Sequence, residues 1–376
     1  METIEKLEVY LDSAHVGTMA LYKKHLAAFE YCGEWLETGF SISPFKIPFT
    51  RGVYIPQYDP FNGLPGIFAD SLPDGWGRLL VDRMLLSNHV DPSSLGILNR
   101  LSIVGDAGMG ALEYRPAQQW KDINEKKSLD FLAAECRKIL ASETCDDIDA
   151  LFRYGGSSGG ARPKALMTLD GEEWIIKFPS SMDPEDVGEM EYSYALCAAK
   201  CGIIVPEVKL FESKICSGYF GVKRFDRKKS SEEKPQKVHM ASVSALLDVS
   251  HRIPSMDYNT MMALTWQLTK DYAELDKMFR LMCFNVFAHN RDDHSKNFSY
   301  IYDKEQGWRL SPAYDLTYSY SIGGEHATSV NGNRKDPGLE DLLCVASKAG
   351  IDKQKAKNTA EEIREITAES LKKYLN

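Results

Sequence analysis

Hydrophobic and polar positions follow β-type spacing over the first part of the chain. Short apolar runs separated by Gly and Pro fill about the first 118 residues, beginning with LEVYL at 7–11. One stretch, 71–86, instead has apolar residues three and four apart, which predicts a helix, as does a stretch near 127–141. The segment 99–116 resembles strands broken by glycines. The pattern therefore predicts a β-rich N-terminal part.

The spacing then predicts a mixture of strands and helix up to about residue 225. A Gly-rich turn comes first, and Asp170-Gly171 is a hairpin signal between two apolar β-runs. The segment 186–202 has an acidic first turn, apolar residues along one stripe and Gly202 as a stop, which predicts a helix. The predicted strands lie at 164–169, 173–178, 207–212 and 219–225.

Helical spacing dominates after about residue 240. The last of these helices has Asn358 as its expected N-cap and Glu361 three residues later. The charged, aperiodic segment 226–237 that precedes them is interpreted as a solvated loop. The predicted helices lie at 259–272, 274–289, 338–349 and 358–375. A mixed α/β half is therefore followed by a mainly helical half.

Composition places the chain among ordinary globular proteins. The 376 residues correspond to about two and a half domains. Hydrophobic residues make up 43% and charged residues 26%, which excludes disorder, collagen-like repeats and a bare coiled coil. The formal net charge of −9 argues against chain-wide, non-specific binding of nucleic acid and leaves room only for a local basic patch.

The N-terminal segment and the cysteines indicate a cytoplasmic protein. METIEKLEVYLDS is acidic and lacks the apolar block of a secretory signal, and no stretch approaches the roughly 18 apolar residues of a membrane span. The eight cysteines include no Cys-x-x-Cys pair that would seed a zinc site, and they are expected to be reduced thiols. Cys197 and Cys201 would share one helix face in the core.

The densest cluster of polar chemistry is AHNRDDHSKNFSYIYDKEQGWRLSPAYDLTYS at 288–319. Phosphoryl transfer in kinases requires a carboxylate that accepts the proton of the attacking hydroxyl, followed by an Asn and a more distant Asp as Mg²⁺ ligands. Asp292, Asn297 and Asp315 have this order and spacing. A polar surface turn is the alternative. A zinc site at His289 and His294 is a weaker interpretation because no third ligand has suitable spacing.

Two further features would serve a nucleotide phosphate. The glycine-rich run from Gly155 to Lys164 lets main-chain amides approach phosphate oxygens, although such runs are often only mobile loops. Lys177 lies in an apolar β-run, where an ammonium needs an anionic partner, and Glu191 on the next helix is the candidate. The alternative is a lysine that reaches solvent from an edge strand. Together these residues predict a kinase-like phosphotransferase.

With these residues in this order, the chain resembles the HipA family of serine/threonine kinase toxins from bacterial toxin–antitoxin pairs. The resemblance covers nearly the whole chain, and its motifs are IFADSLPDGWGR, SIVGDAGMGALEY, SSGGARPKA, WIIKFP, EYSYALCAAKCGIIVPEV, GVKRFDR, HNRDDHSKNFS and LSPAYDLTYS. It implies an α+β, protein-kinase-like two-lobe fold with an extra β-rich N-terminal subdomain. The expected boundaries are 1–120 for that subdomain, 121–225 for the nucleotide-binding lobe and 226–376 for the mainly helical catalytic lobe.

The resemblance also implies roles for the site residues. Asp292 would be the catalytic base, and Asn297 and Asp315 would hold Mg²⁺. Lys177, with Glu191 as its partner, would contact the ATP phosphates. The other nucleotide-binding residues would be Gly159, Gly160, Ala161, Arg162, Pro163 and Lys164 in the loop, His294, Ser295 and Lys296 below the nucleotide, and Lys223, Arg224 and Phe225 in the link between lobes, where side-chain identity should matter less.

The resemblance further implies regulation and partners. Self-phosphorylation of a serine in the glycine-rich loop would shut the kinase off, and Ser157 matches this position, with Ser158 as the alternative. A small helix-turn-helix antitoxin would bind the protein and carry it to operator DNA. The substrate would be a serine of a cytosolic protein, in the best-known members an aminoacyl-tRNA synthetase, the glutamate enzyme in particular. Asp293 stands where small residues are usual and would add to metal attraction.

Two other functions compete with an active kinase toxin. A catalytically idle kinase fold would act as a co-repressor together with the antitoxin, but the intact set Asp292, Asn297 and Asp315 argues against it. A small-molecule phosphotransferase would use similar Asp and Asn chemistry, but it would not need the large β-rich N-terminal part.

Overall fold

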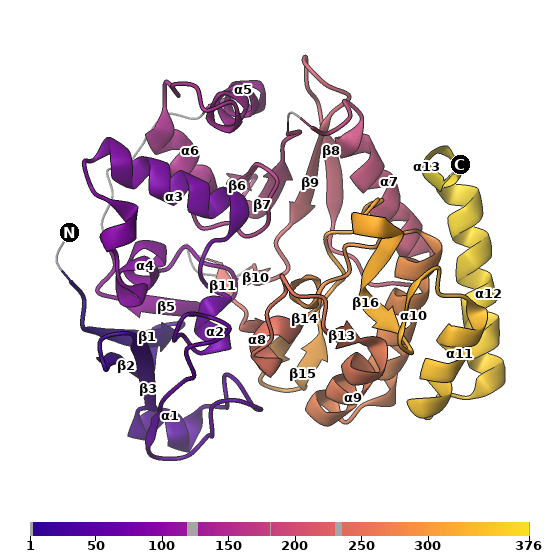
Figure 1. Ribbon diagram of the computed structural model, residues 1–376, viewed down its shortest axis with the longest axis horizontal. Helices are drawn as coiled ribbons and strands as arrows, with labels where there is room; N and C mark the ends of the chain where they lie inside the picture. Colours follow the sequence, from indigo (N-terminus) through magenta and orange to yellow (C-terminus); the bar gives the residue numbers. More distant parts are fainter. Residues whose placement is uncertain (1–2, 119–126, 181, 230–234, 376) are drawn as a thin grey trace. The chain divides into compact units, whose positions relative to one another are not determined.

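The computed structural model describes residues 3–118, 127–180, 182–229 and 235–375 (Figure 1). The chain divides into two compact units. Unit 1 comprises Met1–Gly188, Leu210–Ala241 and Ala245–Asp248, and unit 2 comprises Glu189–Lys209, Ser242–Ser244 and Val249–Asn376. The expected boundary between residues 120 and 121 falls outside the described residues, and the three-part division stays a prediction.

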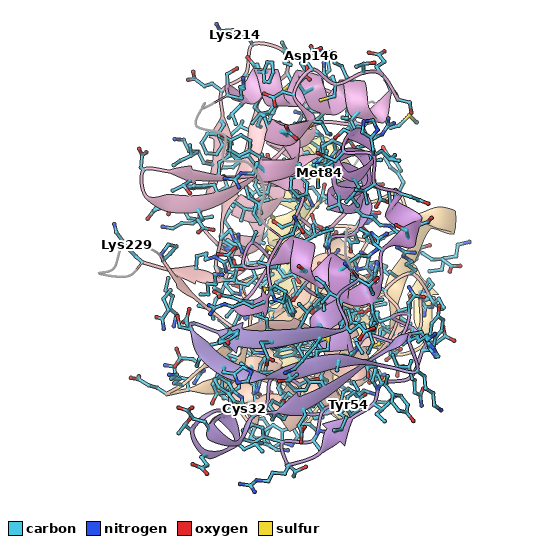
Figure 2. All side chains as sticks on the ribbon, turned by 90° about the vertical axis from the view of Figure 1, so that its left-hand side faces the viewer. Cys32, Tyr54, Met84, Asp146, Lys214 and Lys229 are labelled. Carbon is cyan, nitrogen blue, oxygen red and sulfur yellow. The ribbon has the colours of Figure 1, made fainter. Side chains whose placement is uncertain are left out.

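Unit 1 begins with a five-stranded antiparallel sheet in the order β4-β3-β2-β1-β5. Side chains on β1 alternate between the two faces, so that Leu7, Val9 and Leu11 are buried, which confirms the strand predicted at 7–11. Figure 2 shows Cys32 and Tyr54 at this end of unit 1 and Asp146 and Lys214 at the other end. The strands are β1 (Lys6–Leu11), β2 (Ala14–Tyr22), β3 (Leu26–Tyr31), β4 (Val53–Tyr54) and β5 (Leu112–Arg115).

Four α-helices accompany this sheet, and one of them corrects a prediction. The segment 99–116 was expected to form strands, but its first part belongs to helix α4, which ends at Gly105 with a φ of +55°. Leu98, Leu101 and Val104 are buried at three-residue intervals, and the glycines that suggested broken strands all follow the helix. The helices are α1 (Gly33–Thr38), α2 (Gly66–Ala69), α3 (Gly75–Ser87) and α4 (Ile97–Val104), with a 3₁₀ turn η1 at Pro92–Ser94.

A second sheet of unit 1 has the order β6-β7-β9-β8. The predicted hairpin turn is confirmed, because Asp170 and Gly171 both have positive φ, +52° and +78°, between two paired antiparallel strands. Trp76 of α3 packs with Trp174 and Ile176 of β7 in the core beneath this sheet. The elements are α5 (Leu129–Leu140), α6 (Ile148–Gly155), β6 (Lys164–Leu169), β7 (Glu172–Lys177), β8 (Val208–Phe211) and β9 (Tyr219–Lys223), of which α5 confirms the helix expected near 127–141.

A buried ion network joins the end of β9 to the glycine-rich turn before β5. Asp226 is fully buried and accepts hydrogen bonds from the Arg224 Nη2 at 2.7 Å, the Arg227 Nη1 at 2.9 Å and the Gly110 amide at 2.7 Å. Arg224 and Arg227 also donate to the carbonyl of Gly108. Burial opposes the charged form, yet the two guanidinium groups hold the pKa of the Asp226 carboxyl below its usual value. The short strands β10 (Arg227–Lys228) and β11 (Gln236–Lys237) follow in the segment that was predicted to be a loop.

Unit 2 is mainly helical, as predicted. Its helices α10, α11 and α12 lie side by side (Figure 1) around buried Met278, Phe279 and Met282. Cys197 of α7 and Cys201, just after its last residue, are each 1% exposed, which confirms their expected place in the core. The helices are α7 (Val187–Lys200), α9 (Tyr258–Thr269), α10 (Tyr272–Phe287), α11 (Leu339–Lys348), α12 (Lys353–Ser370) and α13 (Lys372–Leu375), and the chain passes between units through β12 (Met240–Ser242) and α8 (Val243–Leu247).

The N-cap predicted for the last long helix is wrong. Helix α12 begins five residues earlier than Asn358, at Lys353, and Asp352 is its N-cap through a 2.8 Å bond from the Lys355 amide. Ala356 is fully buried, so the apolar stripe of this helix starts before the predicted cap.

Short strands complete unit 2. An antiparallel hairpin of β14 and β15 follows the Asp292 loop. The strands are β13 (Met256–Asp257), β14 (Ser299–Asp303), β15 (Gly307–Leu310), β16 (Glu325–Val330) and β17 (Asn333–Lys335), with 3₁₀ turns η2 (Ser295–Asn297) and η3 (Ile322–Gly324). Within the part of the chain that the structure describes, no helix is both long and apolar enough to cross a bilayer.

The Asp226 network gives a testable expectation for the stability of unit 1. Asp226→Asn should lower the free energy of unfolding by about 3–5 kcal/mol, because two buried guanidinium groups lose their shared counter-charge. Amide hydrogen exchange of β7 and β9 under increasing urea measures this change. The matched control is Glu172→Gln, which breaks the partly exposed 2.6 Å ion pair with Lys223 in the same sheet and should change the stability far less, because solvent screens that pair. Equal effects of the two substitutions would contradict the network's role.

Candidate active site

The predicted nucleotide loop, Gly159 to Lys164, lies between α6 and β6, ends at the first residue of β6 and is held by the start of α3. Asp74 stands at the N-cap of α3 but makes no capping bond there; its carboxylate instead accepts the amide of Gly160. The Trp76 amide donates to the Gly160 carbonyl at 2.9 Å. A Cβ on Gly77 would lie 2.2 Å from the Ser158 carbonyl oxygen, so only glycine fits there. The motif SLPDGWGR thus holds this loop in position, a role that was not predicted from the sequence.

The two loop serines have different surroundings. Ser158 is 2% exposed, and its hydroxyl donates to the Gly155 carbonyl at 2.6 Å. Ser157 is only partly buried. The structure therefore makes the Ser157 hydroxyl the more accessible of the two.

Three basic side chains lie at or next to this loop. Lys164 and Lys177 are direct partners across β6 and β7, so their side chains leave the sheet on the same face. The Lys164 ammonium donates to the Gly159 carbonyl, and the Lys177 ammonium lies 5.6 Å from the centre of the Phe220 ring. Arg162 pairs with Asp183 at 3.0 Å. Two ammonium groups on one face of the sheet are suited to contact an anionic ligand.

The link residues 223–225 were expected to tolerate changes of side chain, and one of the three does not fit that expectation. Lys223 pairs with Glu172 at 2.6 Å, and Phe225 follows in the turn after β9. Arg224 has a buried side chain, 5% exposed, which is bound to Asp226. Side-chain identity therefore matters at Arg224, because its guanidinium is part of the buried ion network.

Lys177 and Glu191 belong to different compact units. Glu191 is buried on α7, at 2% exposure. Their pairing stays a prediction.

In unit 2 the loop after α10 turns two adjacent carboxylates in opposite directions. The side chain of Asp292 is 61% exposed, whereas that of Asp293 is fully buried. The Asp293 carboxylate accepts bonds from the Tyr258 hydroxyl at 2.9 Å and the Thr328 amide at 3.1 Å, and its Oδ2 lies 3.0 Å from the His326 Nδ1. Burial, and next the Asp293 charge, raise the pKa of Tyr258 well above its usual value, so that its hydroxyl keeps the proton it donates.

Asp293 is therefore not turned outward beside Asp292, and its expected contribution to metal attraction stays a prediction. Its carboxylate is turned into the core, where three groups from α9 and β16 already surround it. Asn285 extends the network by donating to the Tyr258 hydroxyl at 3.0 Å and accepting from Asn290 at 2.9 Å. The sequence signal that could have indicated this was the second Asp itself, since a carboxylate in the place of a small residue needs donors.

Asn297 and Asp315 present oxygen atoms on two neighbouring segments. The Asn297 amide nitrogen donates to the Asp292 carbonyl at 2.8 Å, which leaves its Oδ1 as the atom for a cation. The Tyr314 hydroxyl donates to the Lys296 carbonyl at 2.8 Å and so holds the residue before Asp315 beside the residue before Asn297. Asp315 has a φ of +58°, an uncommon conformation outside glycine that aspartate tolerates.

These two residues fit a magnesium ion bound together with substrate. Mg²⁺ prefers oxygen ligands and is commonly held by one or two protein carboxylates plus phosphate oxygens. Among the residues that the structure describes, no three or more His, Cys, Asp or Glu side chains form a metal cluster. An all-protein metal cage, including a zinc site at His289 and His294, therefore has no support there.

The remaining predicted residues shape the same loop. The His294 Nδ1 accepts the Lys296 amide at 3.3 Å, and the His294 Nε2 lies 3.8 Å from the Asp292 carboxylate. Ser295 is buried in η2. His294, Ser295 and Lys296 thus lie between the predicted base and the predicted metal ligand Asn297.

Two family models match the chain: the HipA N-terminal domain over residues 7–115 and the HipA-like C-terminal domain over residues 156–371. The chain belongs to the HipA family. The expected family and the mixed α+β fold of the HipA type are thereby confirmed.

Individual relatives of this HipA-family protein agree with the assignment. A Sinorhizobium fredii protein with the provisional name kinase Y4dM is 26% identical, with 96% of this chain and 90% of that protein aligned. A second protein of the same species, provisionally named kinase Y4mE, is 25% identical over 84% of this chain and 77% of its own length. The Shewanella oneidensis HipA structure, solved with HipB and operator DNA, has a TM-score of 0.72 at 17% identity and covers 98% of this chain and 90% of its own. That likeness shows the fold.

The facing lysines give a testable expectation for nucleotide binding. Lys164→Gln and Lys177→Gln should each raise the dissociation constant of ATP by about tenfold, because each removes a charged donor to phosphate. Titration calorimetry of the full-length protein measures the change. Lys209→Gln, at an exposed lysine on β8 of the same sheet, is the control and should bind ATP like the wild type. Unchanged affinity in both lysine variants would place the phosphates elsewhere.

Proposed function

We propose that this HipA-family protein is an ATP- and Mg²⁺-dependent serine/threonine protein kinase that acts as the toxin of a toxin–antitoxin pair. The observation that carries the proposal is the exposed Asp292 carboxylate, on a loop fixed from inside by the buried carboxylate of Asp293 and from outside by the Asn297 amide. A surface turn needs no such support. Provisional kinase names among the relatives agree with phosphotransfer.

In this mechanism Asp292 accepts the proton of a substrate hydroxyl. The hydroxyl oxygen then bonds to the γ-phosphorus of ATP, the bond from that phosphorus to the β,γ-bridging oxygen breaks, and ADP leaves. Lys177 and Lys164 bind the phosphates, while main-chain amides of the loop from Gly159 to Lys164, other than the Gly160 amide that Asp74 accepts, approach phosphate oxygens. Asn297 and Asp315 would hold Mg²⁺, which neutralises charge on the phosphates when bound.

The family context extends to partners. The Shewanella oneidensis HipA structure contains HipB and operator DNA. By analogy, a small helix-turn-helix antitoxin would bind this protein and supply the contact with DNA, which fits the net charge of −9 on this chain. The substrate would be a serine of a cytosolic protein, and an aminoacyl-tRNA synthetase such as glutamate–tRNA ligase is the first candidate.

Self-inhibition would act through Ser157. Its hydroxyl is the more accessible of the two loop serines, because Ser158 is buried and bonded to Gly155. A phosphate on Ser157 adds close to two negative charges two residues before Gly159, beside the loop that must receive ATP. Repulsion between that phosphate and the nucleotide would lower ATP affinity.

Loss of the proposed base should abolish transfer without unfolding the protein. Asp292→Asn should reduce phosphate transfer from labelled ATP to proteins of a cell extract by at least about a hundredfold. Its ATP affinity and far-UV circular dichroism should match the wild type. Asp303→Asn, at a turn carboxylate of the β14–β15 hairpin, is the control and should remain active. ATP binding without any transfer by the wild type would instead favour an idle fold that serves as a co-repressor.

Peptide mass spectrometry after incubation with ATP tests the self-inhibition. Phosphate is expected on Ser157, and Ser157→Ala should stay active for longer in a preincubated assay. Ser158→Ala is the comparison and should still acquire the modification. Phosphate found only at other residues would remove Ser157 from the regulation.

A further inference from the structure

Unit 2 contains a cavity of about 210 Å³ that the proposed kinase mechanism does not use. It lies between the end of α10, the start of the loop that carries Asp292, β16 and α12. Its polar lining is basic: His289 and Arg291 from the loop, His326 from β16 and Arg364 from α12, with Asp336 as the acidic group. The rest of the wall is formed by Val286 and Phe287 of α10, Pro337, Thr367 and Ala368 of α12, and Leu375 of α13.

The permanently charged side chains that the structure places in the wall of this cavity are Arg291, Arg364 and Asp336, two cations and one carboxylate. Arg291 donates to the Ser319 carbonyl at 3.1 Å, and its second Nη lies 2.8 Å from the His289 Nδ1, so its known partners are neutral. Arg364 is exposed, and within the described residues its guanidinium has no ion pair. Two permanent cations therefore face one carboxylate. The end of α10 contributes only the partial negative charge of a helix C-terminus.

The surroundings of His289 also favour an anion in this cavity. Burial, then the charges of Arg291 and His326, lower the pKa of His289, and Asp336 opposes that shift. Repulsion from neighbouring positive charges raises the free energy of a protonated imidazole at this cavity, and a bound anion would lower that free energy. With its Nδ1 directed at Arg291, neutral His289 carries its proton on Nε2 and is a further donor.

The size of the cavity limits the ligand. Pockets for drug-sized molecules usually span about 300–1,000 Å³, so this one is too small for a nucleotide. Its volume is several times the roughly 30 Å³ that one water molecule occupies in the liquid. We infer that the cavity is a binding site for a tetrahedral phosphoryl dianion, taken as inorganic phosphate or as a phosphorylated side chain, with Arg291 and Arg364 as its charged ligands.

An anion in this site would act on the loop that displays Asp292. Arg291 is the residue before Asp292, and its carbonyl accepts the Ala327 amide at 3.0 Å. His326 of β16, which also lines the cavity, contacts the buried Asp293 carboxylate at 3.0 Å. A ligand that bridges Arg291 to α12 would therefore restrict the loop at two points. The functional meaning of that restriction rests on the proposed kinase activity, but binding itself does not.

The experiment measures binding of inorganic phosphate to full-length Asp292→Asn protein by titration calorimetry at low ionic strength. Arg364→Gln in this background should weaken the site about tenfold through loss of a charged donor. Lys357→Gln, at another exposed basic residue of α12, is the matched control and should bind phosphate unchanged. Asp336→Asn should tighten binding, since it removes the one carboxylate at the cavity and asparagine tolerates the positive φ of 51° there.

Because the glycine-rich loop also attracts phosphate, only the binding that Arg364→Gln removes belongs to this cavity. Hydrogen exchange supplies a second readout: phosphate should slow exchange at residues 289–294, and Arg364→Gln should abolish that effect. Phosphate binding that neither Arg364→Gln nor Asp336→Asn changes would overturn the proposal, whatever the outcome of the kinase assay. A phosphoserine peptide that binds more than tenfold tighter than inorganic phosphate identifies a phosphorylated segment as the source, whereas equal affinity identifies the free ion.

Discussion

The buried carboxylate of Asp293 is the constraint on which the candidate site in unit 2 depends. A charge with no exposed surface is costly unless its oxygens receive hydrogen bonds, and here they receive them from Tyr258 and Thr328, with His326 in contact. These donors come from α9 and β16, so the loop has one position in which all are satisfied. In that position the neighbouring residue, Asp292, is directed to solvent.

The same physical solution recurs in unit 1. Asp226 accepts the Gly110 amide and binds two buried arginines, and Asp74 accepts the Gly160 amide instead of capping its own helix. In each case a carboxylate fixes a glycine-containing turn that has few side-chain contacts of its own. Glycine-rich loops gain access to ligands but lose order, and a carboxylate at the main-chain amide restores that order without filling the space.

Sequence patterns predicted most regular elements and failed where two patterns overlapped. The strands of the second sheet and the hairpin at Asp170 followed from alternation and turn chemistry. Helix α4 was missed because the glycines that follow Val104 dominated the interpretation of 99–116. The start of α12 was missed because Asn358 is a good capping residue by type, whereas burial of Ala356 extends the helix beyond it.

The candidate site, too, was predicted only in part from the sequence. The sequence by itself determined the order and spacing of Asp292, Asn297 and Asp315, because this chemistry depends on residue types in a fixed order along the chain. It could not decide which of two adjacent aspartates faces solvent, that Lys164 lies opposite Lys177, or that Arg364 meets Arg291 at a cavity. Those relations join residues far apart in the chain, and they exist only once strands pair and helices pack.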